Sequence, residues 1–281
     1  MYKDTKWARD ILALQQPDGS WGCFHTLSRP TPRQPMTTEQ ALRRLRALGY
    51  TRDDPPIQRT LCLLHDCLTG RRPLPDRREK SCDWDAFVAL MLAAWIRLFT
   101  DADAAANRVA AAWAGIVTPA LAGGAFDPAA YAVAYRLAFG RPAKGSLLLY
   151  GNSFYHVALL AGALPPETER RWIDYLLRFP TGIYYMYTKP MQLLPDAFRS
   201  RPASAYLAAA ELLARYPHSR DSLRFIADWL LQNGSRRDGW DMGPQARDGV
   251  YFPLSDSWRS PSVRKRDCTY RISRLLDTLI V

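Results

Sequence analysis

The chain has 281 residues, of which 48% are hydrophobic and 12% aromatic, and this is enough apolar material for a sizeable core. No uninterrupted apolar run of about 18 residues occurs, so no transmembrane helix is expected, and because the start MYKDTKWARD has no apolar core we do not expect export. The five cysteines show no paired spacing, which fits reduced thiols, and we expect a cytoplasmic protein.

The formal net charge is +11, and nearly all of the positive charge comes from arginine. A basic surface attracts nucleic acid, acidic sugars, diphosphates or anionic lipid. Motifs for nucleic-acid binding are absent, so no nucleic acid is expected as a partner. Because the arginines form only short runs, a solvated surface explains most of them, and peripheral contact with a membrane remains open. The oligomeric state cannot be deduced from these features.

Apolar residues recur with helical spacing along the whole chain, and alternation with a period of two is nearly absent, so the sequence predicts an all-α protein. Thr37, Asp83 and Asp101 or Asp103 are expected to cap helices. A strand-like stretch is expected at 250–254. In chain order the predicted helices span residues 3–16, 38–48, 56–69, 83–99, 101–122, 128–139, 152–164, 165–179, 202–216, 219–232 and 267–280.

A short pattern near the start returns along the chain. Residues 7–22 read WARDILALQQPDGSWG, and residues 224–243 read RFIADWLLQNGSRRDGWDMG. Two degenerate copies lead to Phe126 and Tyr184, so that the aromatics next to glycine are Trp21, Phe126, Tyr184 and Trp240. A period of 50 to 60 residues predicts a repeat architecture in which each unit is one helical hairpin. The glycine allows the turn that ends the helix, and the aromatic folds back as an apolar plug.

This pattern resembles the QW motif of the squalene-cyclase and prenyltransferase superfamily of α/α toroids. The resemblance implies one domain over residues 1–281, an α/α toroid of five to six helical hairpins. It also implies that the second helix of each hairpin belongs to an inner ring and that a central cavity opens at the N-terminal ends of the inner helices. Because the motif is structural in that family, it implies a fold and no particular reaction.

The expected starts of the inner helices are rich in functional side chains. If the ring closes, these side chains gather at one cavity mouth, where helix N-termini favour anions. The same residue types are also common N-caps, so each has a purely structural alternative. The candidate catalytic residues are Asp83, Asp85, His156 and Asp267. The candidate substrate-binding residues are Glu39, Trp84, Asn152, Tyr155, Tyr206, Asp256, Trp258, Arg259, Tyr270 and Arg271.

The sequence Asp83-Trp84-Asp85-Ala86 resembles the D-x-D-D acid motif of class II terpene cyclases, but its last acid is missing. Protonation-initiated cyclisation is therefore doubtful, and the D-D-x-x-D magnesium motif is also absent. Cys62, His65 and Cys67 form the one local Cys/His cluster, but Cys67 lies off the helix face that the other two share. We therefore expect no metal site and no cofactor.

The resemblance favours a terpenoid cyclase-like or prenyltransferase-like protein that acts on or binds an isoprenoid-type ligand, since aromatic faces and basic groups suit such a ligand. Whether it is an enzyme stays open. One alternative is a carbohydrate-active enzyme on an α/α toroid, a lyase or glycosidase whose cleft is lined with tryptophan. A second alternative is a non-catalytic binding module.

Overall fold

The computed structural model describes residues 2–25, 31–32, 34–250 and 252–280, and in these residues it has eleven α-helices and no β-strand. The all-α prediction is confirmed. The helices are α1 (Lys6–Ala13), α2 (Thr38–Ala47), α3 (Pro55–Leu68), α4 (Trp84–Arg97), α5 (Ala104–Ala120), α6 (Pro128–Phe139), α7 (Phe154–Leu160), α8 (Pro166–Arg178), α9 (Arg201–Leu213), α10 (Arg220–Gln232) and α11 (Pro261–Ile280).

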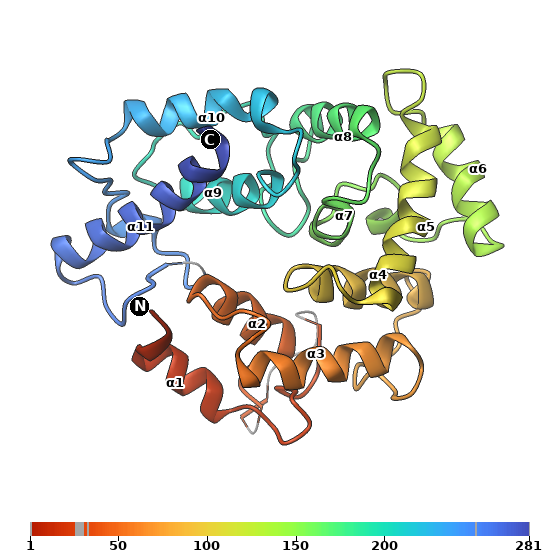
Figure 1. Cartoon of the computed structure of the whole chain (residues 1–281), viewed down its shortest axis with the longest axis horizontal. Helices are drawn as coiled ribbons and strands as arrows, with labels where there is room; N and C mark the ends of the chain where they lie inside the picture. Colours follow the sequence, from red (N-terminus) through yellow and green to blue (C-terminus); the bar gives the residue numbers. More distant parts are fainter. Residues whose placement is uncertain (1, 26–30, 33, 251, 281) are drawn as a thin grey trace.

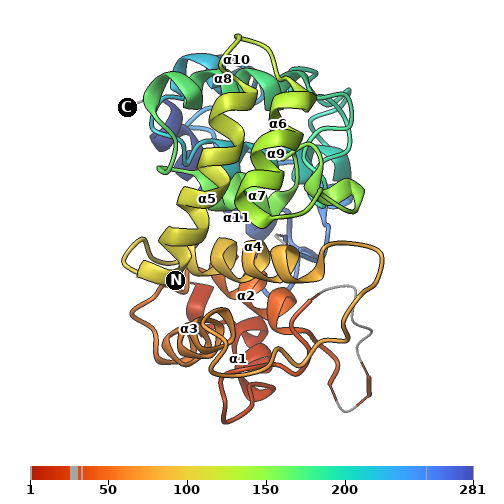
Figure 2. The same cartoon turned by 90° about the vertical axis from the view of Figure 1, so that its right-hand side faces the viewer.

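The helices surround the middle of the molecule. Figure 1 shows α2, α4, α7, α9 and α11 bordering the middle, with α1, α3, α5, α8 and α10 further out and α6 outside α5. Contacts between α1 and α2, α3 and α4, α5 and α7, and α10 and α11 join outer helices to inner ones. Figure 2 shows the loops that follow α8 on the side away from both termini.

Local signals explain where the helices begin. Thr37 accepts a hydrogen bond from the Gln40 N–H and forms a full capping box, while Asp83 and Asp103 cap α4 and α5, as predicted. The helix α7 is shorter than expected, because Ala161 is extended and Gly162 adopts a positive φ. The last helix begins at Pro261, before the predicted start. The expected strand at 250–254 is not formed by its described residues; residue 251 lies outside them.

The first and last copies of the sequence pattern make the same contacts. The indole N–H of Trp21 donates to the Ile11 carbonyl at 2.7 Å, and that of Trp240 donates to the Leu230 carbonyl at 2.7 Å. The backbone N–H groups of the two tryptophans donate to Thr38 Oγ1 and Thr269 Oγ1, each at 2.9 Å. Each tryptophan therefore closes the helix before it and holds the inner helix after it.

The two middle copies differ from this arrangement. Phe126 stacks on Tyr175 with ring centroids 4.4 Å apart, whereas Tyr184 is 48% exposed and does not serve as a plug. Ile183, which precedes it, is fully buried instead.

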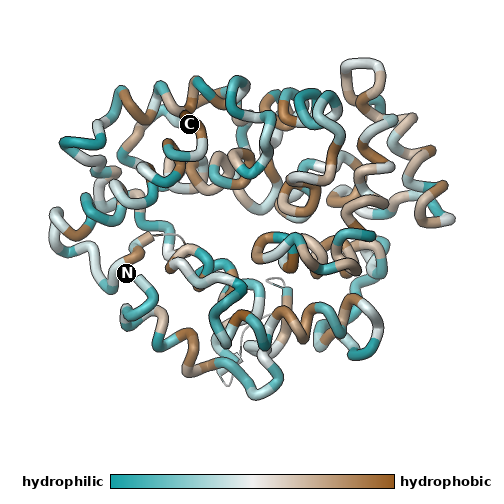
Figure 3. The backbone as a smooth tube through the Cα atoms, viewed as in Figure 1, coloured by the Kyte–Doolittle hydropathy of each residue, from teal (hydrophilic) through white to brown (hydrophobic). Residues whose placement is uncertain are grey.

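One hydrophobic cluster of buried side chains runs from Ala8 in α1 to Leu279 in α11. Hydrophobic and hydrophilic segments alternate along the helices in Figure 3, as expected where one helix face is buried and the other exposed. In the part of the chain that the structure describes, no helix is both long enough and apolar enough to cross a bilayer.

The turn that presents Trp21 requires glycine, and Gly124 provides a matched comparison. Both glycines have φ of +89°, but a Cβ at Gly19 would lie 2.7 Å from the backbone carbonyl of Arg59, while one at Gly124 would meet nothing within 4 Å. We expect Gly124→Ala to lower the free energy of unfolding by about 1–2 kcal/mol, because of its positive φ. Gly19→Ala should lower it by about 1–3 kcal/mol more, because its new Cβ also overlaps the Arg59 backbone. Urea unfolding of both variants measures this; equal losses would contradict the packing argument.

Candidate functional site: a central arginine-rich cavity

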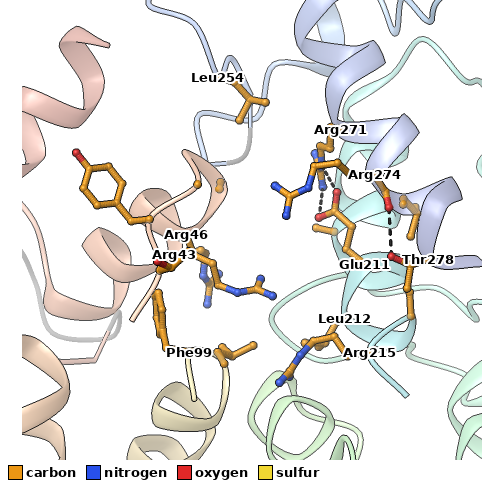
Figure 4. A pocket seen from close by; sticks show the side chains of 18 of the residues that line it. Arg43, Arg46, Phe99, Glu211, Leu212, Arg215, Leu254, Arg271, Arg274 and Thr278 are labelled. Atoms are coloured by element: carbon orange, nitrogen blue, oxygen red, sulfur yellow. Dashed lines mark hydrogen bonds and ion pairs between the residues drawn. The ribbon is translucent and has the colours of Figure 1, made fainter. Parts of the chain in front are cut away.

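A cavity of about 680 Å³ lies between the inner helices (Figure 4). Most of its lining comes from the C-terminal parts of α2, α4, α9 and α11. Phe154 at the start of α7 and residues outside the α-helices add to it, among them Lys3, Tyr50, Met186 and Leu254. A volume of this size is in the range of small-molecule sites. The sequence predicted a cavity at the N-terminal ends of the inner helices. In α2, α4 and α9 the cavity lies instead towards the C-terminal ends.

The cavity wall is strongly basic. Six cationic side chains line it against one acid, Glu211. In Figure 4, Arg43 and Arg46 of α2 and Arg274 of α11 extend towards the middle of the cavity from opposite sides. Arg271 holds Glu211 through Nη2–Oε2 at 3.1 Å and through Nε–Oε1, so the acid is already neutralised. The cationic lining residues are Lys3, Arg43, Arg46, Arg215, Arg271 and Arg274.

Aromatic side chains and a buried carboxylate form the floor. The Arg43 guanidinium lies 4.9 Å from the ring centroid of Phe154 and 5.9 Å from that of Trp95. Beneath them Glu39, fully buried, accepts hydrogen bonds from Trp95 Nε1 at 3.1 Å and from the Tyr155 hydroxyl at 2.8 Å. Glu39 also pairs with Arg43 at 3.4 Å. The floor thus consists of two buried aromatic rings covered by a guanidinium that is paired with a buried carboxylate.

Arg215 links the cavity to the neighbouring helix ends. Its guanidinium donates to the Ala158 carbonyl of α7 at 2.9 Å and to the Arg97 carbonyl of α4 at 2.8 Å. Burial lowers the pKa of Arg215 to about 10, and it therefore stays protonated at neutral pH. Arg97 donates in turn to the carbonyls of Leu159 and Ala161. Cations at helix C-termini are favourable, because those ends carry partial negative charge.

Two of the predicted site residues, Tyr270 and Arg271, line the cavity, and Glu39 lies beneath its floor. The predicted acids Asp83 and Asp85 lie elsewhere, at the start of α4. Asp83 accepts from Arg141 Nε at 2.7 Å and Nη2 at 2.6 Å and from the Tyr135 hydroxyl at 3.1 Å. Asp85 is exposed and pairs with Arg78 at 3.0 Å.

Ion pairing fixes the charge state of Asp83. Burial would raise the pKa of Asp83, but the hydrogen bonds from Arg141, the Ala86 N–H and Tyr135 outweigh it and hold that pKa below its ordinary value. A carboxyl with a lowered pKa is an anion at neutral pH and has no proton to give to a substrate. The geometry of Asp83 is that of a helix cap with an arginine partner.

Asp267 lies inside α11 rather than at its start, and it organises the preceding loop. Its carboxylate accepts bonds from the Leu254 and Ser255 N–H groups, the Ser255 and Tyr2 hydroxyls and Trp258 Nε1, at 2.7 to 3.1 Å. Asp267 and Trp258 are therefore joined in one buried network. Asp256 accepts from the backbone of Trp7 at 3.3 Å, and Arg259 is exposed.

His156 is fully buried, with Nδ1 2.7 Å from Ser153 Oγ and its ring edge-on to Trp113 at a centroid distance of 4.5 Å. Asn152 donates to the Gly182 carbonyl, and Tyr206 donates to the Met191 carbonyl, so both hold loops onto inner helices. Trp84 packs against Phe87. The predicted residues thus fall into several separate clusters.

Among residues whose positions the structure describes, no three His, Cys, Asp or Glu side chains are grouped so that they could share a metal ion. His65, from the local cysteine and histidine cluster, pairs with Asp103 at 2.7 Å, and Cys62 is exposed.

Sequence reasoning overlooked Arg46, Arg215 and Arg274. The usable signal was the spacing of three residues within Arg43/Arg46 and within Arg271/Arg274, which places each pair on one helix face.

Comparison of the chain with protein-family models, with curated proteins and with solved structures finds no match. Functional inference for this chain consequently depends on its own residues and geometry.

The role of Asp83 can be tested against Asp85. Since the folded-state pKa of Asp83 is lowered, its stabilisation is present above the unfolded-state pKa of about 3.9 and is lost as the pH falls through the folded value. We expect Asp83→Asn to lower the free energy of unfolding by about 1–3 kcal/mol at pH 7, less at pH 3, and Asp85→Asn to change it by less than about 0.5 kcal/mol. Denaturant titrations at the two pH values decide this; a pH-independent loss would contradict it.

His156 makes a second pH-dependent contribution. Burial lowers its pKa to about 3, and the unfolded-state value is about 6.5. The unfolded chain therefore binds the extra proton, and stability is lost as the pH falls from 6.5 towards 3, by up to about 1.4 kcal/mol per pH unit. His156→Gln should flatten this slope between pH 7 and pH 5. An unchanged slope in His156→Gln would show that this histidine is accessible to protons.

Proposed function

We propose that this chain is an α/α toroid of the squalene-cyclase and prenyltransferase type, and that its central cavity binds an isoprenoid-type ligand that carries a diphosphate or similar anionic group. The observation that carries the proposal is the combination of arginines from α2, α11 and the turn after α9 with an aromatic floor in one cavity. The equivalent contacts of Trp21 and Trp240, one at each end of the chain, support the repeat on which the toroid assignment depends.

The two parts of such a ligand fit two parts of the cavity. Guanidinium groups bind phosphate oxygens through paired hydrogen bonds, and Arg46 and Arg274 approach from opposite walls. A branched hydrocarbon chain fits against the apolar part of the lining, where Phe99 is partly exposed, while Trp95 and Phe154 lie buried beneath Arg43. Several charges of one sign in a partly enclosed site also raise the local concentration of anions.

Binding, or transfer from a bound diphosphate, is favoured over cyclisation started by a protonated carboxyl. Glu211 is the acid among the lining residues, and it is held by Arg271. Asp83 is held as an anion outside the cavity. The carbohydrate-enzyme alternative needs tryptophans in an open cleft, whereas Trp21, Trp95, Trp113, Trp172 and Trp240 are fully buried.

The proposal is tested by calorimetric binding of farnesyl diphosphate, farnesol and inorganic diphosphate. We expect farnesyl diphosphate to bind more tightly than either part alone and to bind more weakly as salt is added. Arg46→Gln and Arg274→Gln should each weaken this binding by about tenfold, which corresponds to about 1.4 kcal/mol, a usual value for one charged hydrogen bond.

Arg259→Gln is the matched control, because Arg259 is an exposed arginine that does not line the cavity. The Arg259→Gln variant should bind farnesyl diphosphate with the same affinity as the unmodified chain. Absence of binding, or equal losses in all three variants, would refute the cavity as the site. Tighter binding of farnesol than of the diphosphate would refute the anionic part of the proposal.

A further inference from the structure

An exposed apolar surface lies at the end of the molecule where α7 and α9 begin. It consists of five side chains on three loops, with exposed fractions between 36% and 55%, and we name it the loop surface: Leu149, Tyr150, Tyr184, Leu193 and Leu194. Figure 2 shows the loops after α8 on the side away from both termini. The cavity is lined mainly from the C-terminal parts of α2, α4, α9 and α11, and of the loop that holds Tyr184 it includes Met186.

Contacts around the end of α8 hold the three loops together. The Tyr184 N–H donates to the Asn152 carbonyl, and the Phe154 N–H donates to the Tyr184 carbonyl, both at 3.0 Å. The Tyr175 hydroxyl donates to the Tyr150 carbonyl at 2.7 Å, and the Gln192 N–H donates to the Leu177 carbonyl at 3.0 Å. Hydrogen bonds therefore join the loops that carry the loop surface to one another and to α8.

The charge of these loops has one sign. Residues 141–152 and 178–194 contain Arg141, Lys144, Arg178 and Lys189 and no acidic residue. Arg141 is paired with Asp83, so the charge available to a ligand comes from Lys144, Arg178 and Lys189. Arg178 and Lys189 are both exposed. The nearest acid along the chain is Asp196, which lies 3.6 Å from Lys189. Leucine and tyrosine beside lysine and arginine match the interface of a bilayer, where tyrosine sits at headgroup depth and cations meet anionic lipid.

We propose that the loop surface docks the protein onto an anionic lipid bilayer. Leu193, Leu194 and Leu149 enter the boundary between headgroups and acyl chains, Tyr150 and Tyr184 lie among the headgroups, and Arg178 and Lys189 face the lipid phosphates. Long cationic side chains reach outward past apolar neighbours, so both kinds of contact form together. The inference does not depend on what the cavity binds, because none of these seven residues lines the cavity.

The test is flotation of the full chain with vesicles of phosphatidylcholine, with and without phosphatidylserine. We expect the protein to float with the phosphatidylserine vesicles, to release at high salt and to bind pure phosphatidylcholine more weakly. Leu193→Asp should lower the vesicle-bound to free ratio by about tenfold or more, and Lys189→Gln by several-fold. Leu137→Asp is the matched control, since Leu137 on α6 is 82% exposed and lies outside the loop surface.

Three outcomes would overturn the proposal. In the first, the unmodified chain does not float with phosphatidylserine vesicles. In the second, Leu137→Asp reduces flotation as much as Leu193→Asp does, which indicates non-specific adsorption. In the third, sedimentation shows a dimer that Leu193→Asp dissociates while no vesicle binding occurs, which makes the surface an interface between copies of the chain. Circular dichroism of each variant verifies folding, and Lys189→Gln tests the proposal without changing an apolar side chain.

Discussion

The buried carboxylate of Glu39 is the interaction on which the centre of the molecule depends. It accepts hydrogen bonds from Trp95 of α4 and Tyr155 of α7 and pairs with Arg43 of its own helix. Removing a single partner from such a buried pair costs about 3–5 kcal/mol, because the remaining charge has no compensation. One acid thus fixes three inner helices and the height of the cavity floor, and it also holds Arg43 flat over Phe154.

Arginines also form polar contacts in the walls of the cavity and beside it. Arg97 and Arg215 satisfy carbonyls at the ends of α4 and α7, and Arg271 holds Glu211 of α9. These arginines stabilise helix ends that carry partial negative charge. Because guanidinium groups stay protonated at all ordinary pH values, structural stabilisation and a positive cavity arise from the same residues. A site assembled in this way keeps its charge without any titration near neutral pH.

The sequence predicted the helices well, because their signals are local. Thr37, Asp83 and Asp103 cap the helices expected from them, and the tryptophan repeat identified Trp21 and Trp240 as equivalent. The candidate site was much less predictable. Asp83 looked like an acid in a motif, but its partner Arg141 lies 58 residues away in sequence. The cavity arginines carried no motif, and their convergence depends on how α2, α9 and α11 are placed in space.

The reason that the cavity lies at the C-terminal ends can be found at the other ends of the helices. The N–H groups of Thr38 and Glu39 donate to the carbonyls of Cys23 and Phe24, and the Phe154 N–H donates to the Tyr184 carbonyl, all at 3.0 Å. The donors that make helix N-termini attractive to anions are consequently occupied by loop backbone. With those ends closed, an anionic ligand needs side-chain cations, and helix C-termini are where such cations are most stable. In α2, loop backbone thus takes the N-terminal donors, while Arg43 and Arg46 lie towards the C-terminal end.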